Sequence, residues 1–232
     1  MVTLFQGETA GASLVVDPAG AAAYWVAAAT GVINRIPLPD GGTSVALTSP
    51  LGPYEQIELA AGRTSLFWTD YSYVADHPGV VNELSFTEPP MTAPRRFAEA
   101  FRPSRPLFNG PTLYWLDQGA VDSFMRTRSD NLKSSLDSGG IVGWTDAGFN
   151  ATAFAVDSSY AYVLRFGVSG SGEFEGALVK RSLKGEGPGD VLATFPGYAT
   201  SIALDDENAY WTIAFPQSIA LGSAGSIRMV RK

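Results

Sequence analysis

Few side chains in this sequence combine residue types that could carry acid–base chemistry. Asp76 stands next to His77, the only histidine, and Glu58 lies in a short apolar segment. A carboxylate and an imidazole that both reach a substrate can move protons near neutral pH. If the chain is an enzyme, Glu58, Asp76 and His77 are therefore the expected catalytic residues of a small hydrolase or lyase. If it is not an enzyme, no catalytic residue is predicted.

The composition excludes most other kinds of site. The 232 residues include no cysteine and one histidine, which excludes disulfides, thiol nucleophiles and zinc sites built on two imidazoles. A net charge of −7 argues against nucleic acid as a partner. No phosphate-binding loop, nucleophile elbow or calcium loop is found, so no cofactor and no metal are predicted.

Targeting signals are equally sparse. The longest uncharged stretches contain proline and glycine, so no membrane insertion is expected. The first residues do not resemble a signal peptide, although a mature domain would look the same. We favour a secreted or periplasmic location, and the sequence leaves the oligomeric state open.

A repeat of about 47 residues organises the chain. Each copy contains a short apolar strand, then a pair of bulky residues, and then a glycine followed by an alternating strand. The pairs are Tyr24-Trp25, Phe67-Trp68, Tyr114-Trp115, Tyr162-Val163 and Tyr210-Trp211. The first strands of the copies are expected at residues 13–17, 56–60, 105–109, 153–157 and 201–205. The third strands are expected from Gly31, Gly79, Gly119, Gly176 and Gly225.

A fourth strand completes every copy but the last. These strands are expected at residues 44–47, 95–100, 141–145 and 190–195, and residues 127–140 are expected to form a polar loop. The strand at residues 1–5 is expected to pair with the last copy and close the ring, which removes open sheet edges. The prediction is an all-β, five-bladed β-propeller of four-stranded blades, with residues 1–232 as a single domain. A β-sandwich or two small β domains is the alternative.

Three copies resemble the YWTD repeat of β-propellers. The matching residues are Phe67-Trp68-Thr69-Asp70, Tyr114-Trp115-Leu116-Asp117 and Tyr210-Trp211-Thr212-Ile213. The resemblance implies blade architecture and says little about function. Familiar YWTD propellers have six blades and act in protein recognition, whereas this chain has five copies. In size and blade number it is similar to small five-bladed lectins of the tachylectin-2 type, without a sequence match.

Alternation along the first strands predicts which side chains face the axis of the ring. The bulky positions are expected to fill the space between blades, and the smaller, more polar ones to line a central channel. Glu58 and Arg105 fall on this lining in neighbouring copies. They are expected either to form an ion pair or to anchor a ligand. Asp17, Asp157 and Asp205 end first strands, and we expect them to stabilise tight turns.

Long loops between second and third strands are the predicted binding surface. Exposed aromatic rings with a few polar groups suit a sugar or a peptide. The alternative is that these rings only cover the core. The candidate ligand-binding residues are Tyr71, Tyr73, Asp76, His77, Arg165, Phe166, Glu173, Phe174, Phe215 and Gln217, together with Glu58 and Arg105. The leading hypothesis is a non-enzymatic module that binds carbohydrate or a peptide or protein. The alternative is a hydrolase or lyase acting at the mouth of the channel.

Overall fold

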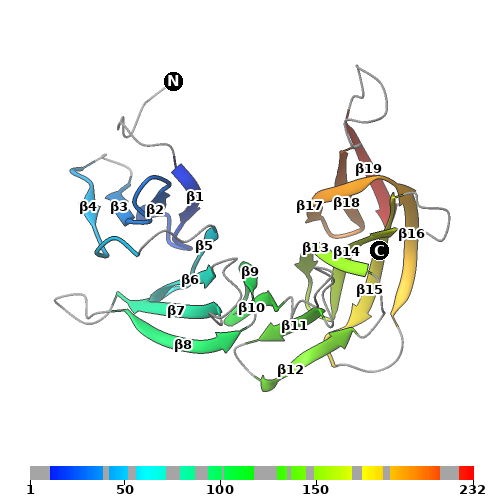
Figure 1. Ribbon diagram of the computed structural model, residues 1–232, viewed down its shortest axis with the longest axis horizontal. Helices are drawn as coiled ribbons and strands as arrows, with labels where there is room; N and C mark the ends of the chain where they lie inside the picture. Colours follow the sequence, from blue (N-terminus) through cyan, green and yellow to red (C-terminus); the bar gives the residue numbers. More distant parts are fainter. Residues whose placement is uncertain are drawn as a thin grey trace. The chain divides into compact units, whose positions relative to one another are not determined.

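The structure is a computed structural model that describes residues 11–38, 42–51, 56–71, 79–86, 94–100, 102–117, 130–134, 137–144, 149–168, 174–184, 189–214 and 225–232. The regular structure of these residues is entirely β-strand (Figure 1). Nowhere in these ranges is there a helix able to cross a membrane. The chain divides into two compact units, Met1–Asp117 and Gln118–Lys232, here called the N-terminal and the C-terminal unit.

The N-terminal unit contains two four-stranded antiparallel sheets and one further strand pair. Within each sheet, every strand pairs with the next one along the chain, so both sheets are simple meanders. The strands are β1 (Gly11–Val16), β2 (Ala22–Ala27), β3 (Ile33–Pro37), β4 (Val45–Ala46), β5 (Gln56–Ala61), β6 (Ser65–Tyr71), β7 (Gly79–Ser85), β8 (Arg95–Ala100), β9 (Pro103–Asn109) and β10 (Thr112–Asp117).

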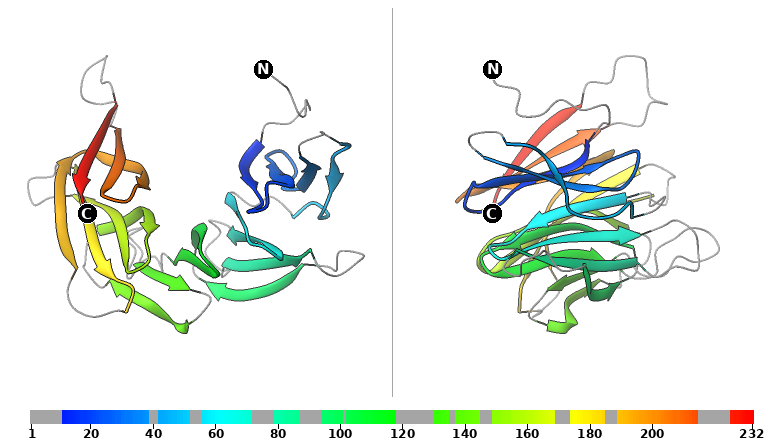
Figure 2. Two further views of the ribbon diagram at one scale, coloured as in Figure 1. Left: turned by 180° about the vertical axis from the view of Figure 1, so that it is seen from behind. Right: turned by 90° about the vertical axis from the view of Figure 1, so that its left-hand side faces the viewer.

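The C-terminal unit contains a strand pair, a four-stranded sheet and a sheet with three strands among the described residues. Figure 2 shows β13 to β16 side by side. The strands are β11 (Asp130–Ser134), β12 (Asp137–Trp144), β13 (Phe149–Val156), β14 (Tyr160–Val168), β15 (Phe174–Ser182), β16 (Asp190–Pro196), β17 (Tyr198–Leu204), β18 (Asn208–Ala214) and β19 (Ser226–Arg231).

The strands predicted from the repeat are largely confirmed. All five expected first strands are present as β1, β5, β9, β13 and β17, and the four expected fourth strands overlap β4, β8, β12 and β16. The bulky pairs lie in β2, β6, β10, β14 and β18, where most of their side chains are buried. Trp68, for example, is fully buried, and replacing such a side chain with alanine costs about 3–5 kcal/mol.

One prediction in the third copy is wrong. Residues 127–140 were expected to form a polar loop, but β11 and the first half of β12 lie within them. Asp130 pairs with Trp144 and Leu132 with Val142, so the polar segment is hydrogen-bonded to an apolar one. Strand formation depends on the pairing partner as well as on side-chain polarity, and the polarity of 127–140 was therefore misleading.

Within each unit, the first strand of one sheet packs against the preceding sheet. β1 contacts β5, β5 contacts β9, and β13 contacts β17. The N–H of Leu59 in β5 donates a hydrogen bond of 3.1 Å to Ser13 Oγ in β1. Leu59, Ile57 and Tyr24 share one apolar core with Trp68. Consecutive repeats are therefore joined by buried apolar contacts as well as by the chain.

Two glycines of third strands leave room for a neighbouring side chain. A Cβ on Gly176, the third residue of β15, would lie 2.1 Å from the ring of Phe195, its partner on β16. A Cβ on Gly79, which opens β7, would lie 2.3 Å from Pro103 Cδ. These contacts explain the glycine at this point of the second and fourth repeats.

Two predicted strands lie outside the described residues. They are the closing strand at residues 1–5 and the third strand expected from Gly119. Ring closure and a single domain over residues 1–232 therefore stay predictions.

Candidate functional site

Six of the ten predicted loop-face residues lie outside the described part of the chain. These residues are Tyr73, Asp76, His77, Glu173, Phe215 and Gln217. Phe174 is the first residue of β15. Their proposed role in binding stays a prediction.

Three predicted loop residues belong to strands. Tyr71 is the last residue of β6 and is 4% exposed, so its ring is part of the packed sheet. Arg165 and Phe166 lie in β14, which continues to Val168 and pairs Phe166 with Gly176. The loop was predicted to begin at Arg165. The strand continues because β15 offers backbone partners for the four residues from Arg165 to Val168.

Phe166 also contacts the next sheet. Its ring meets the half-exposed ring of Tyr198, the first residue of β17, edge to face at 5.0 Å and 84°. This geometry suits aromatic packing between sheets. Tyr198 is therefore a partly exposed ring beside the last residues of β14.

Glu58 and Arg105 are brought together as expected. The Arg105 Nε lies 3.8 Å from Glu58 Oε1, and the Arg105 backbone N–H donates to Glu58 Oε2. Both side chains remain partly exposed. The pair therefore stabilises the junction of β5 and β9 while leaving part of each charged group accessible.

The Arg105 backbone explains why its N–H is free to bond Glu58. Arg105 has a φ of 55°, a left-handed conformation that is uncommon for a residue other than glycine. The register between β9 and β10 shifts at this point, from Leu107 opposite Tyr114 to Ser104 opposite Leu116. A bulge of this kind turns one N–H away from the ladder, and Glu58 accepts its hydrogen bond.

The turn aspartates were predicted to be structural, and this is confirmed. Asp157 Oδ1 accepts the N–H groups of Ser159 and Tyr160, both at 2.9 Å. Its Oδ2 accepts the Tyr162 hydroxyl at 3.0 Å and the Lys232 ammonium at 3.3 Å. Burial by itself would raise the pKa of Asp157, but these bonds lower it overall.

Asp205 repeats this arrangement in the fifth copy. It accepts the N–H groups of Glu207 and Asn208, and the Tyr210 hydroxyl donates to its Oδ2 at 2.6 Å. The tyrosine bond and the two backbone bonds lower the pKa of Asp205 to about 2. In both copies the hydroxyl of a second-strand tyrosine thus donates a hydrogen bond to the aspartate of the preceding turn.

The first copy lacks this hydrogen bond between tyrosine and aspartate. Asp17 and Tyr24 stand seven positions apart, whereas the other two pairs stand five apart. Register shows that the tyrosines are equivalent, because Tyr24 pairs with Val15, and Tyr162 with Ala155. Asp17 accepts the N–H of Ala21 at 3.0 Å, but no bond joins it to Tyr24. The longer turn therefore separates the carboxylate from the hydroxyl.

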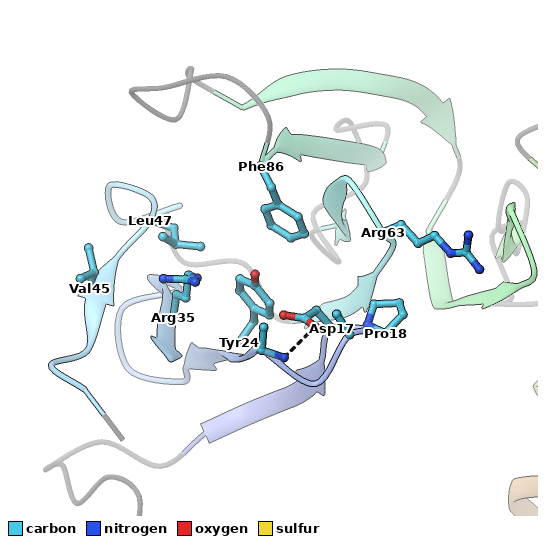
Figure 3. Close-up of a pocket in the computed structure, with 10 residues that line it drawn as sticks. Asp17, Pro18, Tyr24, Arg35, Val45, Leu47, Arg63 and Phe86 are labelled. Atoms are coloured by element: carbon cyan, nitrogen blue, oxygen red, sulfur yellow. Dashed lines mark hydrogen bonds between the residues drawn. The ribbon is translucent and has the colours of Figure 1, made fainter. Parts of the chain in front are cut away.

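A cavity of about 660 Å³ lies beside this open turn, here called the Tyr24 pocket (Figure 3). The Phe86 ring stacks on the Tyr24 ring at 5.3 Å and 13°. Arg35, opposite Tyr24 on β3, lies next to the tyrosine hydroxyl. Burial raises the pKa of Tyr24, and the hydrogen bond and positive charge of Arg35 act to lower it. The remaining lining includes Asp17, Pro18, Val45, Leu47 and Arg63.

The charged side chains of the Tyr24 pocket have no oppositely charged partner within the described part of the chain. Among the described residues, no carboxylate pairs with Arg35 or Arg63, and no side chain donates to Asp17. The guanidinium of Arg63 points away from the other labelled side chains in Figure 3, so Arg35 and Asp17 are the charges closest to the tyrosine. Sequence reasoning missed this pocket, although the two extra residues in the turn were visible.

A smaller cavity of about 430 Å³ occupies the corresponding place beside the second sheet. Here Glu83 holds the position of Arg35, since it pairs with Phe67. Its carboxylate accepts bonds from Ser65 Oγ and Arg95 Nε, both at 2.7 Å. The polar group of this second cavity is therefore already satisfied within the protein.

One further carboxyl is unusual. Asp70, in β6, is 9% exposed, and burial raises its pKa to about 6. The described residues contain no cluster of three acidic or histidine side chains that could hold a metal ion.

Comparison with known proteins identifies the fold. No protein-family model and no curated protein matches the sequence. Solved structures do: a chain in a nidogen/laminin complex has 16% identity over 88% of this chain and 72% of its own, with a TM-score of 0.59. A TolB-like protein from Agrobacterium tumefaciens has 9% identity over 98% of this chain and 79% of its own, with a TM-score of 0.63.

A third neighbour is the hydrazine synthase of Kuenenia stuttgartiensis, with 13% identity, a TM-score of 0.59, and coverage of 87% of this chain and 61% of that one. The nidogen and TolB-like neighbours are β-propeller proteins. The chain has a β-propeller fold. At identities this low the similarity establishes the fold alone.

Proposed function

We propose that this chain is a non-enzymatic β-propeller that binds a ligand of carbohydrate or peptide type. The observation that carries the proposal is the Tyr24 pocket. Its volume of about 660 Å³ falls in the range of small-molecule sites. It combines an apolar wall, formed by Phe86 and Leu47, with the charges of Asp17 and Arg35, which have no oppositely charged partner among the described residues. A few polar groups in an apolar cavity can orient a ligand and give specificity.

The proposal includes five blades in a closed ring. The exposed apolar residues at both ends of the repeat array support it. Leu14 of β1, opposite Trp25, is 68% exposed, whereas its equivalent in β5, Leu59, lies opposite Trp68 and is buried. Ile227 of β19 is likewise 76% exposed, whereas its equivalent in the second sheet is buried. We propose that residues 1–5 supply the fourth strand beside β19 and that both surfaces become covered.

Deletion of residues 1–7 tests the ring. The loss of a closing strand should lower stability by several kcal/mol or make the protein insoluble. Melting at the temperature of the full chain after this deletion contradicts the closure.

The loop-rich face remains a second proposed surface. Tyr73, Phe174 and Phe215 are the residues to replace with alanine there, singly and together. Binding that survives all three changes but is lost on Phe86→Ala places the ligand in the Tyr24 pocket. The enzyme alternative has less support, because Glu58 is engaged by Arg105 rather than held as a free acid or base.

The first experiment is a thermal-shift screen against simple sugars, glycan fragments, amino acids and short peptides. A ligand at one hundred times its dissociation constant stabilises by about 2.7 kcal/mol. In a chain of this size that is a rise of roughly 5–11 °C. A rise that Phe86→Ala removes supports the proposal, and a flat screen across all classes contradicts it.

A further inference from the structure

In the fourth repeat, a lysine of the protein itself contacts the residues equivalent to Asp17 and Tyr24. The Lys232 ammonium bonds Asp157 Oδ2 at 3.3 Å and lies 5.7 Å from the centre of the Tyr162 ring. Both groups are the equivalents of the aspartate and tyrosine in the first repeat. The turn carboxylate and the tyrosine ring therefore form a place that accepts a primary ammonium group.

In the second repeat, Phe86 occupies the position that Lys232 has in the fifth repeat. The Phe86 N–H bonds the Thr64 carbonyl, and the Lys232 N–H bonds the Glu207 carbonyl, each at 2.8 Å at the same point of the repeat. Both residues cover the tyrosine of the preceding repeat. With phenylalanine at this position, a ring covers Tyr24, and none of the described residues donates an ammonium group to the Asp17 carboxylate.

Arg35 adds a charge of the opposite sign. In the fourth repeat its equivalent is Lys180, whose ammonium lies 4.1 Å above the Tyr160 ring. The first repeat has Ala22 where the fourth has Tyr160, so Arg35 lacks that ring and lies by the Tyr24 hydroxyl instead. A guanidinium with no carboxylate partner in the described structure is a good binding group for a ligand carboxylate.

We infer that the Tyr24 pocket binds a small zwitterion of the amino-acid type. Its ammonium bonds Asp17, its carboxylate bonds Arg35, and its apolar side chain packs against Phe86 and Leu47. This inference rests on the proposed function and narrows its ligand to the peptide-type class.

Isothermal titration calorimetry at pH 7 with three related probes tests the inference. L-leucine carries both charges, 3-methylbutylamine lacks the carboxylate, and 4-methylpentanoate lacks the ammonium. We expect leucine to bind with a dissociation constant at least about tenfold lower than either analogue, because each lost charge removes a charge-assisted hydrogen bond.

Two variants assign the charges to residues. Asp17→Asn keeps an acceptor for the Ala21 N–H but removes the negative charge, so leucine and 4-methylpentanoate should then bind equally weakly. Arg35→Gln should in the same way make leucine and 3-methylbutylamine equal. Asp190→Asn, an exposed aspartate in β16, is the matched control and should leave all three constants unchanged.

The outcomes separate this inference from the proposed function. Analogues that bind as tightly as leucine overturn the inference. So does a sugar that binds in a Phe86-dependent way when leucine does not, although the proposed function then stands. If no sugar, amino acid or peptide in the thermal-shift screen binds, both fall.

Discussion

The turn aspartates of the first and fourth repeats are equivalent in position but differ in their contacts. In the fourth repeat a short turn places Asp157 against Tyr162, and Lys232 completes the contact. In the first repeat two additional residues move Asp17 away from Tyr24, and Phe86 replaces the lysine. The Asp157 carboxylate is therefore used to stabilise the folded protein, whereas the Asp17 carboxylate remains available to a ligand. Equivalent residues in a repeat thus differ in role because of turn length and one neighbouring side chain.

The largest expected difference is in stability. Asp157→Ala removes four hydrogen bonds and should lower the free energy of unfolding by about 3 kcal/mol. Asp17→Ala removes one bond and should cost about 1 kcal/mol or less. Urea unfolding at pH 7 measures both values. Equal losses for the two variants contradict the comparison.

Asp70 should show the opposite pH dependence to Asp157. Its pKa in the folded protein is about 6, above the unfolded value of 3.8, so folding favours the protonated form. Stability from this group is therefore present below pH 4 and lost as the pH rises through 6. Asp70→Asn should stabilise the protein by about 2 kcal/mol at pH 8 and have little effect at pH 4.

Asp157 provides the contrasting titration. Its folded pKa is lowered, so its contribution is present above pH 4 and declines as the pH falls through the folded pKa. Urea unfolding of Asp70→Asn and Asp157→Asn at pH 3, 4, 6 and 8 should give differences from the parent protein that change in opposite directions with pH. Parallel changes exclude this assignment.

The tyrosine hydroxyls should differ in coupling. Tyr162→Phe removes the bond to Asp157 and should cost about 1 kcal/mol. A double-mutant cycle with Asp157→Ala should give a coupling energy of about 1 kcal/mol, whereas the cycle of Tyr24→Phe with Asp17→Ala should give a value near zero. Similar coupling in both repeats contradicts an open turn in the first.

The smallest expected change in stability comes from exchanging the covering residue. Phe86→Lys should place an ammonium above Tyr24 and beside Asp17, as Lys232 is placed above Tyr162. The lost ring stacking and the gained ion pair should nearly cancel, to within about 1 kcal/mol. Ligand binding in the pocket should nevertheless be abolished in calorimetry. Unchanged binding shows that the ligand lies elsewhere.

Features that depend on local pattern were predictable from the sequence. The bulky pairs mark the second strands, and aspartate at the end of a first strand marks a turn that its side chain stabilises. Alternation along the first strands also predicted that Glu58 and Arg105 lie on the same lining, and the two side chains do meet. Each of these follows from the period of a strand or from the chemistry of one side chain.

Features that depend on which chain segments meet were not predictable. The Tyr24 pocket requires Phe86 from the next repeat to lie over Tyr24, and no local pattern records that contact. The sequence of β11 is polar, and β11 forms a strand because its backbone pairs with β12. Its own residue pattern does not predict that pairing. Tyr71 and Phe166 were predicted to lie in loops, but both are paired in strands. The end of a strand depends on how far its partner extends, which the local sequence does not show.

Arg105 limits how far the repeats can be treated as interchangeable modules. Its left-handed backbone is compensated by a carboxylate from the repeat before it, and the residues equivalent to Glu58 in the fourth and fifth repeats, Ala153 and Ser201, carry no carboxylate. Shuffling the repeats, or building an array from one consensus copy, would separate the strained residue from its acceptor. The Glu58–Arg105 pair thus requires the second repeat to precede the third. Any engineered propeller based on this chain therefore has to keep those two repeats together.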